Sequence, residues 1–150
     1  MRVVTWNILS GQPTQDGGNL FNAINQLDAD VIALQEVDHL QPRSNGIKTI
    51  DEIADKCGYI SWAFAPALIG TPGFSWNKAE AIHTHTEPKE LDTSYGIGLL
   101  SRIPVKSWKQ LNLNGSPVGL PLLITTPKGL RMAYVADEPR VAIAAVLEND

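Results

Sequence analysis

The sequence has 150 residues, of which 43% are hydrophobic and 19% are charged, and this composition is typical of a globular domain rather than a disordered chain. The longest uninterrupted apolar run, residues 141–147, is far shorter than the ~18 residues that cross a bilayer, and the N-terminus lacks the layout of a secretion signal. A single cysteine, Cys57, excludes an internal disulfide, so we predict a cytoplasmic protein.

The net charge is −4, and the acidic excess lies in the first sixty residues, where 4 basic side chains face 8 acidic ones. This distribution disfavours broad electrostatic capture of a nucleic-acid backbone. It is compatible with binding of a hard divalent cation.

The first sixty residues read as alternating strands and helices. Residues 2–8 predict a strand, 19–27 a helix with one apolar stripe, and 31–36 a short buried strand, which together make a β-α-β unit. The turn-forming cluster 41–46 then breaks the chain before a second amphipathic helix over 47–57.

The character of the chain changes after Gly58. Aromatic and β-branched segments separated by Gly, Pro and Asn predict strands at 59–65, 95–101, 105–113, 121–126, 130–136 and 140–148. Residues 66–94 are expected to form a long irregular loop. The whole pattern predicts an α/β layered protein with a mixed sheet, forming a single domain over 1–150.

Two polar side chains stand at the ends of the first two predicted strands. The crossover of a β-α-β unit makes these strands parallel, so Asn7 and Glu36 are expected at the same edge of the sheet, where open α/β sheets bind ligands. A carboxylate that ends an apolar run is costly to desolvate unless it meets a cation or several donors. Glu36 is therefore a candidate ligand for Mg²⁺ or Mn²⁺, with Asn7 orienting either a phosphate oxygen or a carboxylate that does not itself touch the metal. The alternative is that each side chain caps its strand and touches solvent or a helix N-terminus.

Four segments, in order, carry a family resemblance: "TWNIL", "DVIALQEVD", "PRSNG" and "YGIGLLSRIPV". Together they resemble the endonuclease/exonuclease/phosphatase superfamily. The resemblance implies a four-layer α/β/β/α sandwich with mixed sheets, of which this chain supplies the N-terminal part. It also implies hydrolysis of a phosphoester by a metal-activated water, with Glu36 binding the metal and Asn7 organising the phosphate.

The resemblance also draws attention to Tyr95, Arg43 and Ser44. Some relatives carry Tyr-Gly-Asn where this chain has Tyr95 and Gly96 followed by Ile97, so Tyr95 is either a catalytic residue or a packing residue. Arg43 and Ser44 resemble an Arg-Ser pair of bacterial members. Arg43 either clamps a phosphate with two hydrogen bonds or is a solvated loop residue.

Two later motifs of the superfamily, Gly-Asp-x-Asn and Ser-Asp-His, do not occur in the sequence. We therefore expect the chain to be the N-terminal portion of a longer domain, inactive by itself and able to self-associate through an exposed sheet face. The expected substrate is a phosphoester, whether a small molecule, a nucleotide, a lipid head group or nucleic acid. The alternative function is a non-catalytic or degenerate member of the fold that acts as a binding module.

Overall fold

The computed structural model describes residues 1–11, 19–79, 81–116, 119–126, 129–135 and 137–148. The helical elements are η1 (Leu9–Gly11), α1 (Leu20–Leu27), η2 (Pro42–Ser44) and α2 (Thr49–Cys57), where η marks a 3₁₀ turn. The strands are β1 (Val3–Asn7), β2 (Val31–His39), β3 (Ser61–Gly70), β4 (Trp76–Lys78), β5 (His83–Thr84), β6 (Ser94–Ser101), β7 (Val105–Leu113), β8 (Leu120–Thr126), β9 (Gly129–Val135) and β10 (Arg140–Leu147).

Both predicted helices are confirmed, and each has a local reason to begin or end where it does. The side-chain oxygen of Asn19 accepts hydrogen bonds from the backbone N–H groups of Phe21 and Asn22, which caps α1. Gly58, with a φ of 72°, ends α2 in the left-handed conformation that glycine adopts readily. The helices bury one apolar side each, and the buried residues are Ile24, Ile50, Ile53, Ala54 and Cys57.

The first sheet is mixed, as predicted. Strands β1 and β2 are parallel, and Asn7 lies opposite Gln35 in their register. Strand β6 pairs antiparallel with both β2 and β3. The strand order is β1-β2-β6-β3-β4, and the short β5 pairs with β3 beside this path.

Residues 66–94 are more regular than the sequence predicted. Strand β3 continues to Gly70, and β4 and β5 both pair with it. The prediction of one long irregular loop was wrong because short strands at a sheet edge carry too few residues to show an alternating pattern. Residue 136, which the predicted strand 130–136 includes, lies outside the described residues.

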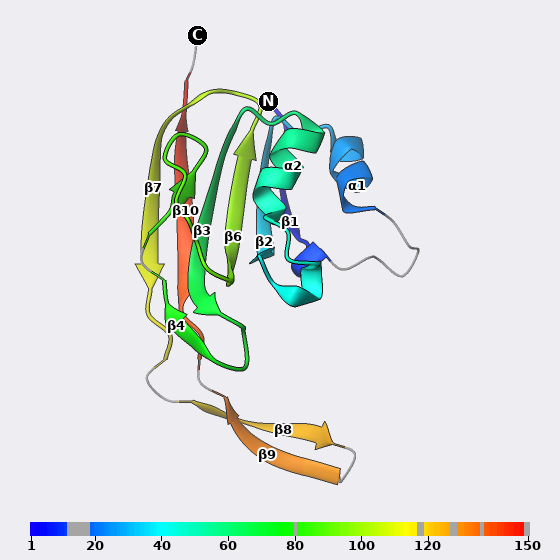
Figure 1. The fold of residues 1–150 in the computed structure, drawn as a ribbon, viewed down its shortest axis with the longest axis vertical. Helices are drawn as coiled ribbons and strands as arrows, with labels where there is room; N and C mark the ends of the chain where they lie inside the picture. Colours follow the sequence, from blue (N-terminus) through cyan, green and yellow to red (C-terminus); the bar gives the residue numbers. More distant parts are fainter. Residues whose placement is uncertain (12–18, 80, 117–118, 127–128, 136, 149–150) are drawn as a thin grey trace.

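The layers are visible in Figure 1: α1 and α2 cover one face of the first sheet, and the β7–β10 pair lies on its other side. The core between helices and sheet contains Ile32, Leu34, Phe64 and Leu100. Strands β8 and β9 form a separate hairpin that projects from this body (Figure 1). This arrangement is three layers, helix on sheet on sheet, of the α/β/β/α sandwich that was expected.

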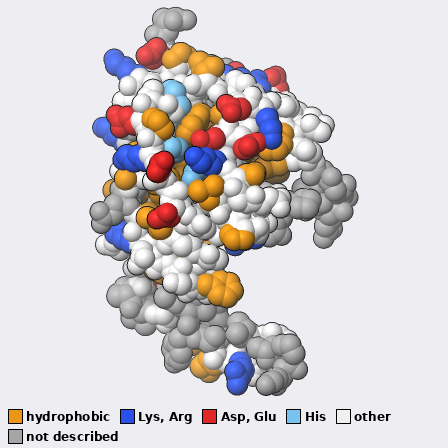
Figure 2. Space-filling view, viewed as in Figure 1, with side chains coloured by type: hydrophobic (Ala, Val, Ile, Leu, Met, Phe, Trp, Pro, Cys, Tyr) orange, Lys and Arg blue, Asp and Glu red, His pale blue; other side chains and the backbone are white. Residues whose placement is uncertain are grey.

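Charges of both signs are mixed on the face of the molecule that Figure 2 shows. Figure 2 shows acidic and basic side chains interspersed over the body on this face, without a continuous basic region. In the described part of the chain, neither helix is long and apolar enough to span a membrane.

Two histidines are buried under α2. The ring of His39 stacks on Phe64, with 5.4 Å between ring centroids, and its centroid lies 6.1 Å from that of His83. Burial, with the nearby charges of His83 and Lys48, lowers the pKa of His39 to about 4. Burial likewise lowers the pKa of His83, against the opposing effect of Asp51.

These histidines predict acid sensitivity. Both side chains are neutral in the folded protein and bind protons more readily in the unfolded chain. Their contribution to the free energy of unfolding is therefore fully present above the unfolded pKa near 6.5 and is lost as the pH falls toward 4. For His39 we expect roughly 1.5 kcal/mol less free energy of unfolding at about pH 5 than at about pH 6.5. Urea denaturation at several pH values measures this loss. His39→Gln should reduce the pH dependence, whereas an unchanged pH dependence would contradict the assignment; His85→Gln is the matched control.

Candidate active site

The amide of Asn7 and the carboxylate of Glu36 meet at one edge of the first sheet. Asn7 Nδ2 donates a hydrogen bond of 2.8 Å to Glu36 Oε1, and Asn7 Oδ1 accepts one of 3.0 Å from the backbone N–H of Leu9. The parallel pairing of β1 with β2 sets this approach, because it places Asn7 beside the residue that precedes Glu36. The predicted proximity of the two side chains is confirmed.

Glu36 does not end its strand, as the sequence suggested, but lies in a bulge within β2. The pairing with β6 shifts between Leu34 and Val37, so Gln35 and Glu36 together oppose one residue. Glu36 adopts a φ of 56°, which is uncommon for a residue with a side chain. Such a bulge redirects the side chain, and backbone strain of this kind concentrates at functional sites.

A cavity of about 370 Å³ opens beside this pair. Its lining comes from four strands of the first sheet, β1, β2, β3 and β6, and from the beginning of β10. Its lining residues are Asn7, Gln35, Glu36, Ala67, Tyr95, Gly96, Ile97, Pro139, Arg140 and Val141. Ala67 is the extra residue of a second bulge, in β3, so β6 is flanked by two bulges at this point.

Tyr95 joins the predicted site in this cavity. Tyr95 is the second residue of β6 and lies opposite Asp38 on β2 and Leu68 on β3. Burial raises the pKa of Tyr95 to about 12, and the negative charge of Glu36 adds to this effect. The hydroxyl is therefore protonated at neutral pH and is able to donate a hydrogen bond.

Arg43 is bound to a buried carboxylate. Its Nε and Nη2 atoms donate hydrogen bonds of 2.8 and 2.7 Å to the two oxygens of Asp38, whose side chain is 0% exposed. This hydrogen bonding raises the pKa of Arg43. The guanidinium also lies 5.4 Å from the centre of the Tyr95 ring, so Arg43 supports a residue of the cavity from outside it.

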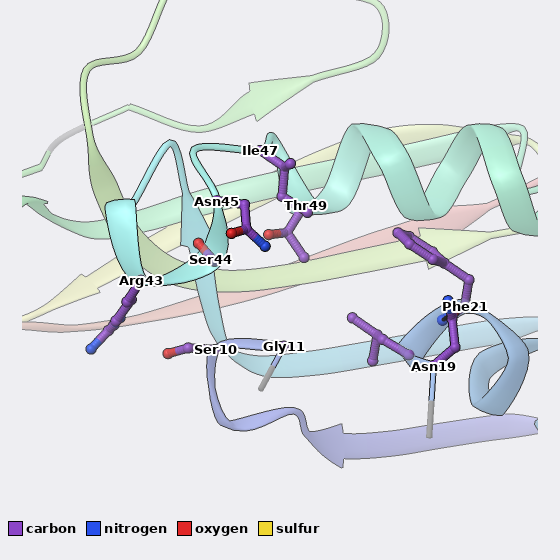
Figure 3. A pocket seen from close by; sticks show the side chains of 10 residues that line it. Ser10, Gly11, Asn19, Phe21, Arg43, Ser44, Asn45, Ile47 and Thr49 are labelled. Carbon is purple, nitrogen blue, oxygen red and sulfur yellow. Dashed lines mark hydrogen bonds between the residues drawn. The ribbon is translucent and has the colours of Figure 1, made fainter. Parts of the chain in front are cut away.

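Ser44 follows Arg43 in η2, where its hydroxyl donates a hydrogen bond of 3.1 Å to the carbonyl of Gln41. Both residues line a second hollow, shown in Figure 3, between η1 and η2. A direct contact of either residue with substrate remains a prediction.

Arg140 is a site candidate that the sequence did not single out. It lines the cavity with Glu36 and Tyr95 and is the first residue of β10. Its guanidinium makes two hydrogen bonds, of 3.0 and 2.7 Å, to Asp137, which also accepts one from the backbone N–H of Ser116. The available signal was an arginine directly before an apolar strand, which is common and gives no indication of a site by itself.

The donors at the cavity suit part of a magnesium or manganese shell. Mg²⁺ is commonly held by one or two carboxylates together with waters and substrate phosphates. Glu36 supplies one carboxylate, and Asn7 holds one of its two oxygens in place. Within the described ranges, no group of three or more His, Cys, Asp or Glu side chains is placed to hold a metal.

Gly96 allows the backbone of β3 to approach β6 closely. A Cβ atom at this position would lie 2.8 Å from the Cα of Pro66 and would collide with the carbonyl oxygen of Ala65. Gly96→Ala is expected to lower the free energy of unfolding by about 2 kcal/mol, since backbone atoms cannot move aside. Chemical denaturation measures the loss.

Gly98→Ala offers a matched comparison, because its Cβ would clash only with the side chain of Ile50. Adding Ile50→Val to Gly98→Ala should recover part of the stability that Gly98→Ala loses. No single side-chain reduction should restore the stability of Gly96→Ala. Equal and small effects of both substitutions would contradict the close backbone approach.

Comparison with known proteins identifies the family of the chain. The family model described as the Endonuclease/Exonuclease/phosphatase family matches residues 4–139. The chain therefore belongs to this family, whose name covers enzymes that hydrolyse phosphoester bonds. A search of curated proteins gave no match.

Among solved structures, the chain is similar to the endonuclease/exonuclease/phosphatase from Beutenbergia cavernae DSM 12333, at 20% identity and a TM-score of 0.52. The alignment covers 96% of this chain and 37% of that protein. At this identity the likeness shows the fold, and the chain spans little more than a third of the other protein's length.

Proposed function

We propose that the protein is a phosphoester hydrolase that uses Mg²⁺ or Mn²⁺ to activate water. The observation that carries the proposal is the hydrogen bond of 2.8 Å between Asn7 and Glu36 inside a cavity that also contains Tyr95 and Arg140. The cavity thus combines a carboxylate, an amide, a neutral phenol and a guanidinium, which suit the charges of a phosphoester. Membership of the family supports the same reaction class.

Each side chain has a separate role in this proposal. Glu36 holds the metal, and Asn7 keeps that carboxylate in position through its amide. When bound, the ion supplies charge neutralisation at the phosphate and lowers the pKa of a water. The Tyr95 hydroxyl donates to a phosphate oxygen, and Arg140, whose guanidinium is held by two hydrogen bonds to Asp137, lines the cavity at the start of β10.

Arg43 and Ser44 are proposed to contribute to substrate binding from outside the cavity. The two donors of Arg43 that face Asp38 are occupied, so its contribution to binding comes mainly from holding the Tyr95 ring. We expect the substrate to be a small phosphoester, a nucleotide or a lipid head group before duplex DNA, because the net charge is −4 and charges of both signs are interspersed on the face that Figure 2 shows. A cytoplasmic location stays a prediction.

The experiment is hydrolysis of bis(4-nitrophenyl) phosphate and of 4-nitrophenyl phosphate by the full-length protein, with Mg²⁺ and then with excess chelator. Turnover that requires the ion supports the proposal. Turnover that survives complete chelation contradicts it. Absence of any turnover, together with retained binding of a partner, would favour the alternative of a non-catalytic binding module.

Residues 1–150 by themselves are proposed to be inactive and to self-associate. The outer face of the β7–β10 pair exposes Leu111 and Val146, and the alternate residues of β10 face the first sheet. Light scattering over a range of concentrations should show a mass above that of one chain. Leu111→Lys should lower that mass, and a single-chain mass at every concentration would contradict self-association.

A further inference from the structure

The dipeptide Asn-Gly occurs at two places in the sequence, Asn45–Gly46 and Asn114–Gly115. Both asparagines are exposed to solvent. In this dipeptide a backbone nitrogen reaches the preceding side-chain amide easily, because glycine has no Cβ atom to hinder the approach. The structure gives the two dipeptides opposite surroundings, and the difference bears on their chemical stability.

The first dipeptide is held in a closed turn. Asn45 follows η2 with a left-handed backbone, at a φ of 61° and a ψ of 21°, and its N–H donates a hydrogen bond of 3.1 Å to the carbonyl of Pro42. The N–H of Gly46 donates one of 2.9 Å to the carbonyl of Gln41. Attack by the Gly46 nitrogen on the Asn45 side chain requires rotation about ψ of Asn45, so this last hydrogen bond has to break first.

The second dipeptide, which directly follows β7, has its backbone nitrogen free. Among the described residues, the N–H of Gly115 has no hydrogen-bond partner. The Asn114 side chain is bound instead, because its Oδ1 atom accepts a hydrogen bond of 2.8 Å from the ammonium of Lys78 on β4. A positive charge at this oxygen draws electrons from the amide carbon and stabilises the negative charge that develops there during attack.

We propose that Asn114, assisted by Lys78, is a self-modification site at which asparagine converts to aspartate and isoaspartate. The Gly115 nitrogen gives its proton to a solvent base and bonds to Cγ of Asn114, and the side-chain nitrogen takes a proton from water and leaves as ammonia. Water then opens the five-membered imide at either carbonyl. One opening gives aspartate, and the other gives isoaspartate, whose backbone contains one extra carbon. Water is the only co-reactant.

The modified residue would lie at the base of the β8–β9 hairpin. Asp137 accepts a hydrogen bond of 2.7 Å from the N–H of Ser116 and two from the guanidinium of Arg140. Gly115 is so near the carbonyl oxygen of Asp137 that a Cβ atom on Gly115 would collide with it. An extra backbone carbon at Asn114 therefore displaces Ser116 from Asp137. This consequence is independent of the proposed phosphoester hydrolysis.

The test is incubation of the folded full chain in water labelled with heavy oxygen, at neutral and mildly alkaline pH, followed by mass spectrometry of its peptides. The peptide with Asn114 should take up heavy oxygen, separate into two products and react faster at higher pH. The peptide with Asn45 should react about tenfold more slowly, because its turn has to open first. In concentrated urea the two sites should react at similar rates.

Two lysine variants test the assistance by Lys78. Lys78→Met should slow the reaction at Asn114 about three- to fivefold, a modest factor because the contact is exposed to water. Lys106→Met removes an exposed lysine near the start of β7 and should leave the rate unchanged. Equal rates at Asn114 and Asn45 in the folded protein, or an unchanged or higher rate in Lys78→Met, would overturn the proposal.

The effect on the hairpin base has its own readout. New NMR signals for Ser116 and Arg140 should appear in the aged protein, because isoaspartate lengthens the backbone. Asn114→Asp reproduces the other product and should keep these signals near their original positions, because aspartate still accepts the hydrogen bond from Lys78. Original Ser116 and Arg140 signals in a sample that mass spectrometry shows to contain mainly isoaspartate would contradict the displacement of Ser116.

Discussion

Replacing Glu36 with glutamine is expected to lower Mg²⁺-dependent hydrolysis by the full-length protein roughly a thousandfold, equivalent to about 4 kcal/mol of transition-state stabilisation. Glutamine keeps the shape and retains an oxygen that accepts the hydrogen bond from Asn7 Nδ2. The bulge in β2 should therefore survive, and the loss should come from the missing negative charge at the metal. Steady-state kinetics with bis(4-nitrophenyl) phosphate measure the change.

A second readout separates metal binding from turnover. Substoichiometric Mn²⁺ should broaden the NMR signals of residues around Asn7, Glu36 and Tyr95, and Glu36→Gln should remove this broadening. Glu148→Gln changes an exposed glutamate beyond the end of β10 and should alter neither measurement. If Glu36→Gln shows the same Mn²⁺ broadening and the same turnover as the wild type, Glu36 does not bind the metal.

Arg43→Met is expected to lower the free energy of unfolding by about 3 kcal/mol, because it leaves the carboxylate of Asp38 buried without its partner. Losses for fully buried pairs run to about 5 kcal/mol, and the lower figure applies because the Arg43 side chain is 37% exposed. The same substitution removes the support of the Tyr95 ring, so turnover should fall while the protein is still folded. Urea denaturation gives the first effect and kinetics give the second.

Arg102→Met provides a closely matched control. Arg102 also pairs with an aspartate, Asp28, and lies 5.2 Å from the centre of the Tyr59 ring, but the Asp28 side chain is 71% exposed. Its loss should lower stability by less than about 1 kcal/mol. Similar losses of stability for the two arginine substitutions would contradict the expected contribution of the Arg43–Asp38 pair. Normal stability of Arg43→Met with strongly weakened substrate binding would instead favour a direct hydrogen bond from Arg43 to the phosphate.

The sequence alone was sufficient for the elements with strong periodicity. The stripe in 19–27 and the inward positions of 47–57 predicted α1 and α2, since burial on one side of a helix leaves a repeat of 3.6 residues. The β-α-β unit then implied that Asn7 and Glu36 meet, because its crossover makes neighbouring strands parallel. The order of "TWNIL", "DVIALQEVD" and "YGIGLLSRIPV" was enough to indicate the family that the comparison later matched.

Other features depend on contacts between residues distant in the chain, and no local pattern encodes them. Glu36 adopts its left-handed backbone conformation where two residues of β2 lie opposite one residue of β6. A glutamate in the sequence does not predict that conformation. Arg140 lies at the site because β10 begins at the wall of the cavity, although it follows Glu36 by more than a hundred residues in the sequence.

The local sequence thus determined which segments become helices and strands, because backbone propensity and one-sided burial act over a few residues. Tertiary structure decided where the charges go: Arg43 turns to Asp38, whose full burial demands a partner, rather than outward. It also formed the hollow beside Ser44, since that space exists only when η1, η2 and two helix ends come together. The energy of a buried polar group depends on its neighbours in space, and those neighbours are set by the packing of whole elements.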